Sequence, residues 1–212
     1  MTTTLTRDQV AALLGSVADL MIAQKDELAT LDADLGDGDL GRTIERGFLA
    51  IKTALADPNA PAGEDIGRML FRLGKAFSND AASSFGALFG TALMKGGMAL
   101  KDKHEAALSD FADATDTALK ALMERGKAKL GDKTMLDAIA PALDAMRAAA
   151  ADAPVSTFFR TAADAAQLGA VATQNMQSQI GRASWQGERS AGKMDPGARA
   201  IAMMLDAAAK SM

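Results

Sequence analysis

The segment from Leu31 to Gly41 contains four aspartates and three glycines between two stretches of helix-like composition. Carboxylate oxygens are the ligands that hard cations such as magnesium and calcium prefer. Closely spaced carboxylates also repel one another unless a cation lies between them. The glycines permit a tight turn whose backbone N–H groups can face an anion. The segment therefore predicts a site for magnesium and phosphate.

A calcium loop of the EF-hand type is one alternative for this segment, and a solvated acidic turn is another. The EF-hand pattern requires a glutamate at its twelfth position, but the twelfth residue counted from Asp32 is Thr43. Magnesium shares a few carboxylates with substrate phosphates and keeps several waters, which suits a loop that offers little besides aspartate. We expect Asp32, Asp37 and Asp39 to be the metal ligands, and Asp34 to cap the loop or face water.

Two other segments have residue types suited to an anionic ligand. Residues 131–137, Gly-Asp-Lys-Thr-Met-Leu-Asp, are expected to begin a helix, whose free N–H groups could bind an anion, although Asp132 or Thr134 could simply cap it. Residues 177–195 form the longest stretch without a helical pattern and include Arg182 and the only tryptophan. Long loops inside compact domains are usually functional, so we expect a lid over a phosphorylated ligand.

No catalytic acid or base stands out beyond the metal and phosphate ligands. The single histidine, His104, has no partner at catalytic spacing. Trp185 could stack on a base, but packing of the capping loop on apolar surface explains it equally well. The methionines recur at helical spacing and suit a core.

Composition predicts an all-α protein. The chain of 212 residues has no tyrosine and few other β-favouring residues, and we expect a single domain over 1–212. The absence of cysteine excludes disulfides and thiolate metal sites and fits a reducing compartment, so we expect a cytoplasmic protein. A net charge of -4 argues against binding of nucleic acid, and no signal peptide or membrane span is expected.

Hydrophobic periodicity and helix start and stop signals predict eight helices. The first begins at a capping box, Thr6 to Gln9, and a kink or a split is expected at Pro141 in the sixth. The fourth is rich in glycine and alanine, which suits close helix–helix approach. The expected ranges are 6–31, 41–56, 63–77, 84–100, 104–126, 132–151, 156–176 and 196–211.

Several separated segments together resemble one family, the nucleotide-binding L subunit, or equivalent C-terminal domain, of dihydroxyacetone kinases. The resemblance spans nearly the whole chain. The segments that carry it, in the family's order, are Asp32 with Gly36-Asp-Gly-Asp39, residues 84–91, Gly131 to Asp137, Gly181-Arg-Ala-Ser184, Gly187-Glu-Arg-Ser190 and Asp195-Pro-Gly197.

The resemblance implies an eight-helix antiparallel barrel with the nucleotide site at one end. It implies two magnesium ions on the three aspartates, bound ADP or ATP, and a ketose held on a partner K subunit. Phosphate would come from ATP or, in another branch of the family, from a phosphotransferase-system protein. The residues it assigns to the nucleotide are Leu40, Gly41, Arg42, Thr43, Ser83, Ser84 and Arg182 near the phosphates, Gly126, Met135, Asp195, Pro196 and Gly197 around the adenosine, and Thr134.

The chain departs from the family pattern in two places. Where the family commonly has a histidine and an asparagine after the last loop aspartate, this chain has Leu40 and Thr43. The family's Gly-Ala-Ser-Gly-like segment is here Ala82-Ser-Ser-Phe-Gly-Ala87. These differences suggest a divergent branch acting on another ketose, such as a tetrulose. The alternatives are a fatty-acid-kinase-like ATP-binding domain and a nucleotide-responsive interaction protein.

Overall fold

The computed structural model describes residues 3–212, which form nine α-helices, two 3-10 helices and two short strands. The α-helices are α1 (Arg7–Ala23), α2 (Lys25–Ala33), α3 (Leu40–Leu55), α4 (Ile66–Asp80), α5 (Ser84–Ala99), α6 (Leu108–Gly126), α7 (Leu136–Ala149), α8 (Val155–Ala172) and α9 (Pro196–Lys210). The 3-10 helices are η1 (Thr173–Asn175) and η2 (Arg182–Ser190), and the strands are β1 (Thr4–Thr6) and β2 (Glu105–Ala107).

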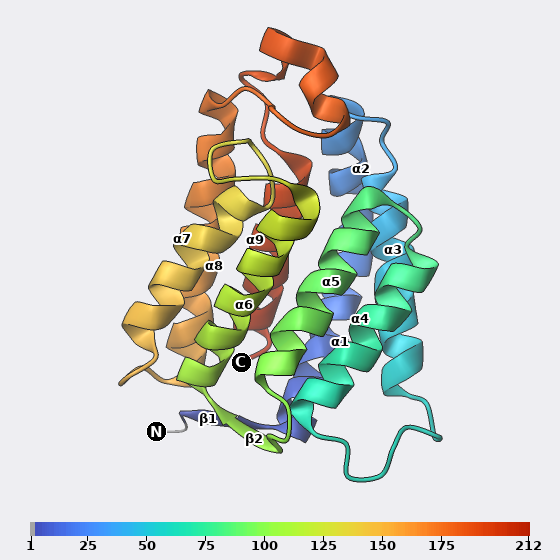
Figure 1. Ribbon diagram of the computed structural model, residues 1–212, viewed down its shortest axis with the longest axis vertical. Helices are drawn as coiled ribbons and strands as arrows, with labels where there is room; N and C mark the ends of the chain where they lie inside the picture. Colours follow the sequence, from blue (N-terminus) through green and yellow to red (C-terminus); the bar gives the residue numbers. More distant parts are fainter. Residues whose placement is uncertain (1–2) are drawn as a thin grey trace.

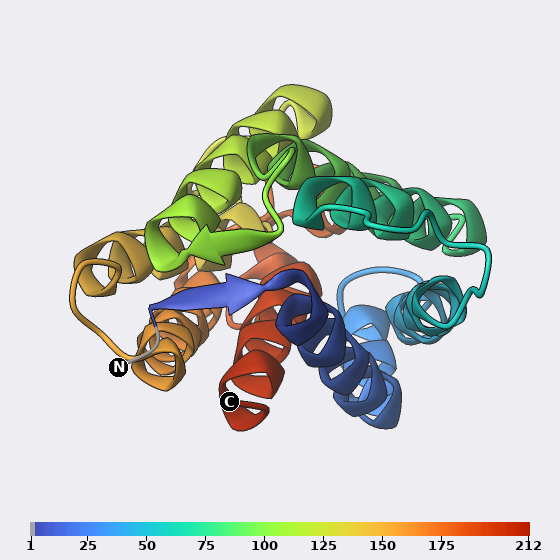
Figure 2. The same ribbon diagram turned by 90° about the horizontal axis from the view of Figure 1, so that it is seen from below.

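Eight of the helices form a closed ring. Helix α1 packs on α3, each helix from α3 onward packs on the next, and α9 returns to α1. Neighbouring helices run in opposite directions, and the view along the ring in Figure 2 shows how they surround a shared interior. Helix α2 continues the direction of α1 at one end (Figure 1). The predicted all-α class and eight-helix antiparallel barrel are therefore confirmed.

Small residues let the helices approach closely, as the composition of the fourth predicted helix suggested. A Cβ atom on Gly74 in α4 would lie 2.7 Å from the carbonyl oxygen of Gly90 in α5. At the next crossing point, a Cβ atom on Gly97 would lie 2.8 Å from the carbonyl oxygen of Gly67. Side chains that point inward form one continuous apolar core. The aromatic rings of Phe48 and Phe77 meet edge to face there, with centroids 5.4 Å apart.

Two local features differ from the predicted elements, and a third decides between two expected alternatives. The first predicted helix is broken at Gln24, where φ is -104° and ψ is 11°. Residues 105–107, expected to be helical, instead form β2, which pairs antiparallel with β1. The two strands are about a hundred residues apart in the sequence. Each has only three residues, so neither shows the alternating hydrophobic pattern from which a strand is predicted. The sixth predicted helix continues through Pro141 as one helix, which is the unsplit alternative of the prediction.

The ring has two different ends. The β1–β2 pair lies at one end, and at the other lie the α2–α3 loop and the segment containing η2 (Figure 1). Because the chain alternates in direction, the N-termini of α3, α5, α7 and α9 all lie at the loop end. Helix N-termini present free N–H groups and the positive end of the helix dipole, so this end favours an anion.

None of the described helices combines the length and the apolar composition needed to cross a bilayer.

Candidate functional site

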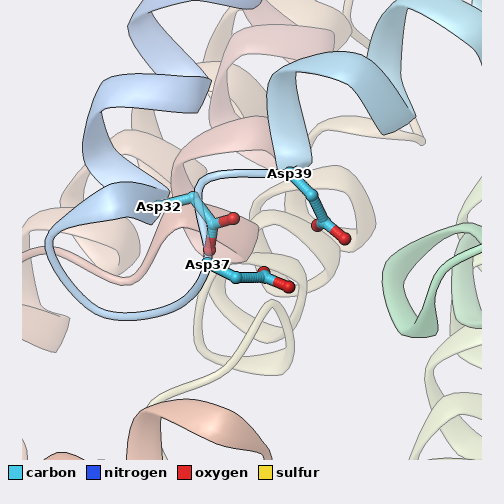
Figure 3. A group of neighbouring side chains, drawn as sticks. All are labelled: Asp32, Asp37 and Asp39. Atoms are coloured by element: carbon cyan, nitrogen blue, oxygen red, sulfur yellow. The ribbon is translucent and has the colours of Figure 1, made fainter.

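The three predicted metal ligands lie together at the loop end of the barrel. Asp32 is in the last turns of α2, Asp37 is in the connecting loop, and Asp39 immediately precedes α3. One carboxylate oxygen from each lies within 4.8 Å of the others. Figure 3 shows the three side chains near one another, with Asp32 at the end of α2 and Asp37 and Asp39 on the connection to α3. Three hard oxygen donors at this spacing fit a magnesium ion that keeps waters in its remaining positions.

Backbone hydrogen bonds give the aspartate loop its shape. The carbonyl oxygen of Asp32 accepts the N–H of Gly36 at 2.6 Å, and the Asp32 carboxylate accepts the N–H of Leu40 at 3.1 Å. Asp32 therefore closes the loop from both sides. Gly38 has a φ of 73°, in the left-handed region that glycine adopts at little cost. The order of aspartate and glycine thus sets the direction in which each carboxylate points.

Arg182, at the start of η2, lies directly beside these carboxylates. Its guanidinium forms an ion pair with Asp37, and Nη1 lies 3.9 Å from a carboxylate oxygen of Asp39. About half of each of these side chains is exposed, so the group is open to solvent and to a ligand. An arginine next to metal-binding carboxylates can neutralise a bound phosphate from the opposite side.

The turn before α5 supplies hydroxyl groups to the same region. The Ser83 side chain caps α5 by accepting the N–H of Gly86 at 3.0 Å. The hydroxyl of Thr43, on α3, donates to the Ser83 oxygen at 3.0 Å. Thr43 is itself buried and does not line the pocket, whereas its partner Ser83 does. This contact joins two segments that the sequence does not relate.

A polar pocket of about 180 Å³ is open to this end of the barrel. Ten of the sixteen predicted metal and nucleotide residues line it, from four separate segments of the chain. Its lining is Asp32, Leu35, Gly36, Asp37, Asp39, Leu40, Ser83, Ser84, Phe85, Arg182, Ala183, Asp195, Pro196 and Gly197.

The structure leaves the remaining predicted residues outside the pocket lining. Gly41 packs α3 against α2, because a Cβ atom there would lie 2.7 Å from the Cβ of Ala29. Arg42 is exposed, and Gly126 ends α6. Thr134 accepts the N–H of Leu136, which is the local capping role considered above. Met135 is buried behind Gly197 and Thr43 behind Ser83.

Helix α7 begins later than predicted, at Leu136. The carboxylate of Asp137 accepts the N–H groups of Gly131 at 2.6 Å and Thr134 at 2.8 Å, which holds residues 131–134 in a turn. Asp132 does not cap the helix, because its carboxylate accepts the N–H of Lys129 at 2.8 Å. These free N–H groups are therefore already used, and the predicted anion site at this helix start is not formed by them.

Two lysines that the sequence reasoning did not select attach the η2 segment to the barrel. Lys193 donates to the carbonyl oxygen of Asp34 at 2.7 Å and so joins the segment to the aspartate loop. Asp34 uses its backbone for this contact, and its carboxylate is not part of the cluster of Asp32, Asp37 and Asp39. The second lysine, Lys133, is only 2% exposed, and burial lowers the pKa of its ammonium group. No local pattern distinguishes a buried lysine from an exposed one.

Asp195 is a buried carboxylate at the rim of the pocket. It caps α9 by accepting the N–H of Ala198 at 2.7 Å, with Pro196 at the first helical position, as the sequence predicted. Burial raises the pKa of Asp195 to about 7, although the Ala198 hydrogen bond and the charge of Lys133 act in the opposite direction.

This raised pKa predicts a pH-dependent stability. Between about pH 4 and 7 the unfolded chain releases the Asp195 proton more readily than the folded chain does, so the contribution of this group to stability falls as pH rises. Asp195→Asn keeps a cap and removes the titration. The stability of the variant relative to the unsubstituted protein should therefore increase with pH, by up to about 1.4 kcal/mol per unit. Urea unfolding from pH 4.5 to 8 measures this difference, and parallel curves for the two proteins would contradict it.

Comparison with known proteins agrees with this geometry. The sequence model of the DAK2 domain matches residues 34–210. The PEP-dependent dihydroxyacetone kinase ADP-binding subunit DhaL of Escherichia coli is 31% identical over 95% of this chain and 95% of its own length. The L-erythrulose kinase of Pectobacterium atrosepticum is 36% identical over 93% of this chain, which spans only 34% of that protein.

A solved structure shows the same arrangement of helices. The crystal structure of the dihydroxyacetone kinase from C. freundii in complex with AMP-PNP and Mg2+ superposes with a TM-score of 0.75 and 29% identity, over 96% of this chain and 34% of that one. These matches run along nearly the whole chain and confirm the resemblance seen in its motifs. The chain belongs to the DAK2 domain family.

Proposed function

We propose that residues 1–212 act as one nucleotide-binding phosphotransferase subunit of a kinase for dihydroxyacetone or a related short ketose. The observation that carries this proposal is the placement of Asp32, Asp37 and Asp39 within 4.8 Å of one another, at the end of the barrel that carries the N-termini of α3, α5, α7 and α9. Such a site combines ligands for a cation with a field that favours an anion. A magnesium–nucleotide complex has both parts.

Each side of the pocket suits a different part of the nucleotide. The three aspartates would hold one or two magnesium ions, which when bound neutralise and orient the phosphates. Ser83, Ser84 and Arg182 lie on the same pocket and would contact phosphate oxygens. Asp195, Pro196 and Gly197 form another part of the lining and would border the adenosine. The bound nucleotide is proposed to be ADP or ATP.

The substrate is proposed to be held by a separate K subunit. The DhaL relatives are named as ADP-binding subunits, and this chain spans almost the full length of the one from E. coli. By contrast, it spans about a third of the erythrulose kinases and of the C. freundii dihydroxyacetone kinase, which contain a further two thirds of chain. We therefore propose that the part of the kinase that binds the ketose lies outside residues 1–212.

The phosphate source has two candidates among the relatives. The DhaL proteins of E. coli and Listeria innocua are named PEP-dependent, which suits a phosphotransferase-system protein that rephosphorylates bound ADP. The C. freundii dihydroxyacetone kinase binds AMP-PNP, an analogue of ATP, which suits exchangeable ATP instead. The relatives named as erythrulose kinases make erythrulose a candidate substrate in addition to dihydroxyacetone. The cytoplasmic location remains a prediction from the sequence.

Reconstitution tests the proposed function. The purified chain, a K subunit encoded beside it, Mg2+ and either dihydroxyacetone or erythrulose are combined with ATP or with a PEP-driven phosphoryl donor. We expect ketose phosphate to form only when both chains and Mg2+ are present, and the donor that supports turnover identifies the branch. Binding of Mg2+–nucleotide without phosphoryl transfer to any ketose would instead favour a nucleotide-responsive interaction protein.

A further inference from the structure

The ammonium group of Lys133 is held by three backbone carbonyl oxygens and lies almost wholly inside the protein. Nζ donates to Met176 at 3.1 Å, to Ser190 at 2.6 Å and to Lys193 at 2.5 Å. The residue itself is 2% exposed. A buried charge is costly unless its hydrogen-bonding capacity is met, and an ammonium group has three donors. In this protein, each of the three N–H donors of the ammonium group has a carbonyl oxygen as its acceptor.

The positions of these acceptors along the chain indicate what the lysine does. Met176 precedes the segment of residues 177–189, whereas Ser190 and Lys193 follow it. One side chain therefore ties together the two ends of a loop whose central part, which contains most of η2, projects from the barrel (Figure 1). The backbone of Lys133 has a φ of 62°, which is an unfavourable conformation for any residue other than glycine. This conformation is part of the turn that directs the Lys133 side chain toward the loop base.

Other contacts make the base of this loop rigid but leave its tip exposed. The hydroxyl of Ser190 accepts the N–H of Ser178 at 2.9 Å and donates to the carbonyl oxygen of Gly187 at 2.6 Å. At the tip, Trp185 is 83% exposed and the Arg182 side chain is 56% exposed. The position of Arg182 over the aspartates therefore depends on how firmly the base of its loop is held.

We infer that Lys133 is a positioning residue that fixes the loop of residues 177–189 on the barrel and thereby places Arg182 over the nucleotide phosphates. This inference rests on the proposed function, because it assigns Arg182 to a bound nucleotide. Without the ammonium group, three carbonyl oxygens lose their donor and the attachment of the loop base weakens, although the hydrogen bond between Ser178 and Ser190 remains. Arg182 must then be ordered when the nucleotide binds, which weakens binding.

The first test compares Lys133→Met, which keeps the length of the side chain, with the unsubstituted protein. We expect the dissociation constant for ADP with Mg2+, measured by isothermal titration calorimetry, to rise about 10- to 100-fold, which is typical for loss of a group that orients ligand-binding residues. Lys103→Met is the control, because Lys103 pairs with Asp110 and lies two residues before β2, which is at the opposite end of the barrel. The control should bind ADP as the unsubstituted protein does.

A double-mutant cycle separates positioning from general stability. If Lys133 acts through Arg182, then Lys133→Met should change ADP affinity little once Arg182→Ala is already present. Full additivity of the two effects would overturn the inference, as would unchanged affinity in the single variant. If Lys133→Met does not fold, Ser190→Ala loosens the same loop base without removing the ammonium group. It should weaken ADP binding in the same direction and should also lose this effect in the Arg182→Ala background.

Limited proteolysis tests the attachment of the loop without requiring that the protein bind a nucleotide. Trypsin can cut after Arg182 and Arg189, both in the loop. The Lys133→Met protein should be cut there several-fold faster than the Lys103→Met protein, with the rest of the barrel left intact. If the unsubstituted protein binds no nucleotide but this cleavage difference is present, the loop attachment stands and the proposed function fails. Equal cleavage rates would overturn the role of Lys133.

Discussion

Replacing Asp37 with asparagine is expected to weaken Mg2+-dependent ADP binding by about 100-fold or more, equivalent to about 3 kcal/mol. The substitution keeps the shape of the side chain but removes one of the three negative charges that gather within 4.8 Å. A divalent cation depends on those charges, and the nucleotide phosphates depend on the cation. Isothermal titration calorimetry with ADP in excess Mg2+ measures the change.

Asp34→Asn is the matched control for this prediction. Asp34 lies in the same loop, but it contacts Lys193 through its backbone carbonyl, and its carboxylate is outside the three-aspartate cluster. The control should therefore bind ADP within a few-fold of the unsubstituted protein. Equal affinities for all three proteins would show that the aspartate cluster does not hold the cation.

Replacing Gly86 with alanine is expected to lower stability by about 2–3 kcal/mol and the Tm by about 5–10 °C. An added Cβ would overlap the carbonyl oxygen of Ala81 and would lie 2.9 Å from the Ala81 Cβ, so the backbone of this turn must move. The same turn holds Ser83, whose hydroxyl accepts the Gly86 N–H. Nucleotide binding should fall together with stability because Ser83 and Ser84 line the pocket.

Gly15→Ala is expected to change the stability of the protein in the opposite direction. Gly15 lies within α1, and an added Cβ there would have no atom within 4 Å. Alanine favours a helix relative to glycine, so this variant should gain about 0.5–1 kcal/mol. Thermal and urea unfolding of both variants give the comparison. A Gly86→Ala protein as stable as Gly15→Ala would contradict the close contact at Ala81.

Local signals in the sequence were sufficient to predict most of the helices. The Thr6–Gln9 capping box and the Asp195-Pro196 start both lie where they were expected, because such caps involve residues only a few positions apart. The strand pair was missed for the opposite reason. It depends on hydrogen bonds between residues 4–6 and 105–107, and three residues carry too little pattern to reveal a strand.

The aspartate cluster could be predicted from the sequence because one short segment contains both the carboxylates and the turn that brings them together. Asp32, Asp37 and Asp39 are close in sequence, and the intervening glycines allow their carboxylates to meet. Contacts between segments were not predictable in this way. The hydrogen bond from Thr43 to Ser83 depends on how α3 packs beside the α4–α5 turn, which no local spacing determines.

Contacts between distant segments also determine the role of residues 131–137, so the sequence predicted this role only in part. Its composition suggested an anion-binding helix start, but the structure uses the N–H groups of that turn for Asp137 and buries Lys133 beneath the η2 loop. The expectation of a capping loop over the ligand, by contrast, rested on length and composition. Arg182 and Ala183 of that loop do line the pocket.

The most direct test of the central claim is the affinity of the chain for ADP with and without magnesium, after removal of any nucleotide that co-purifies. The three aspartates should make binding depend on the metal, so calorimetry should show a dissociation constant at least about 100-fold lower in Mg2+ than in EDTA. Equal affinity in Mg2+ and EDTA, or no binding in either, would contradict the account.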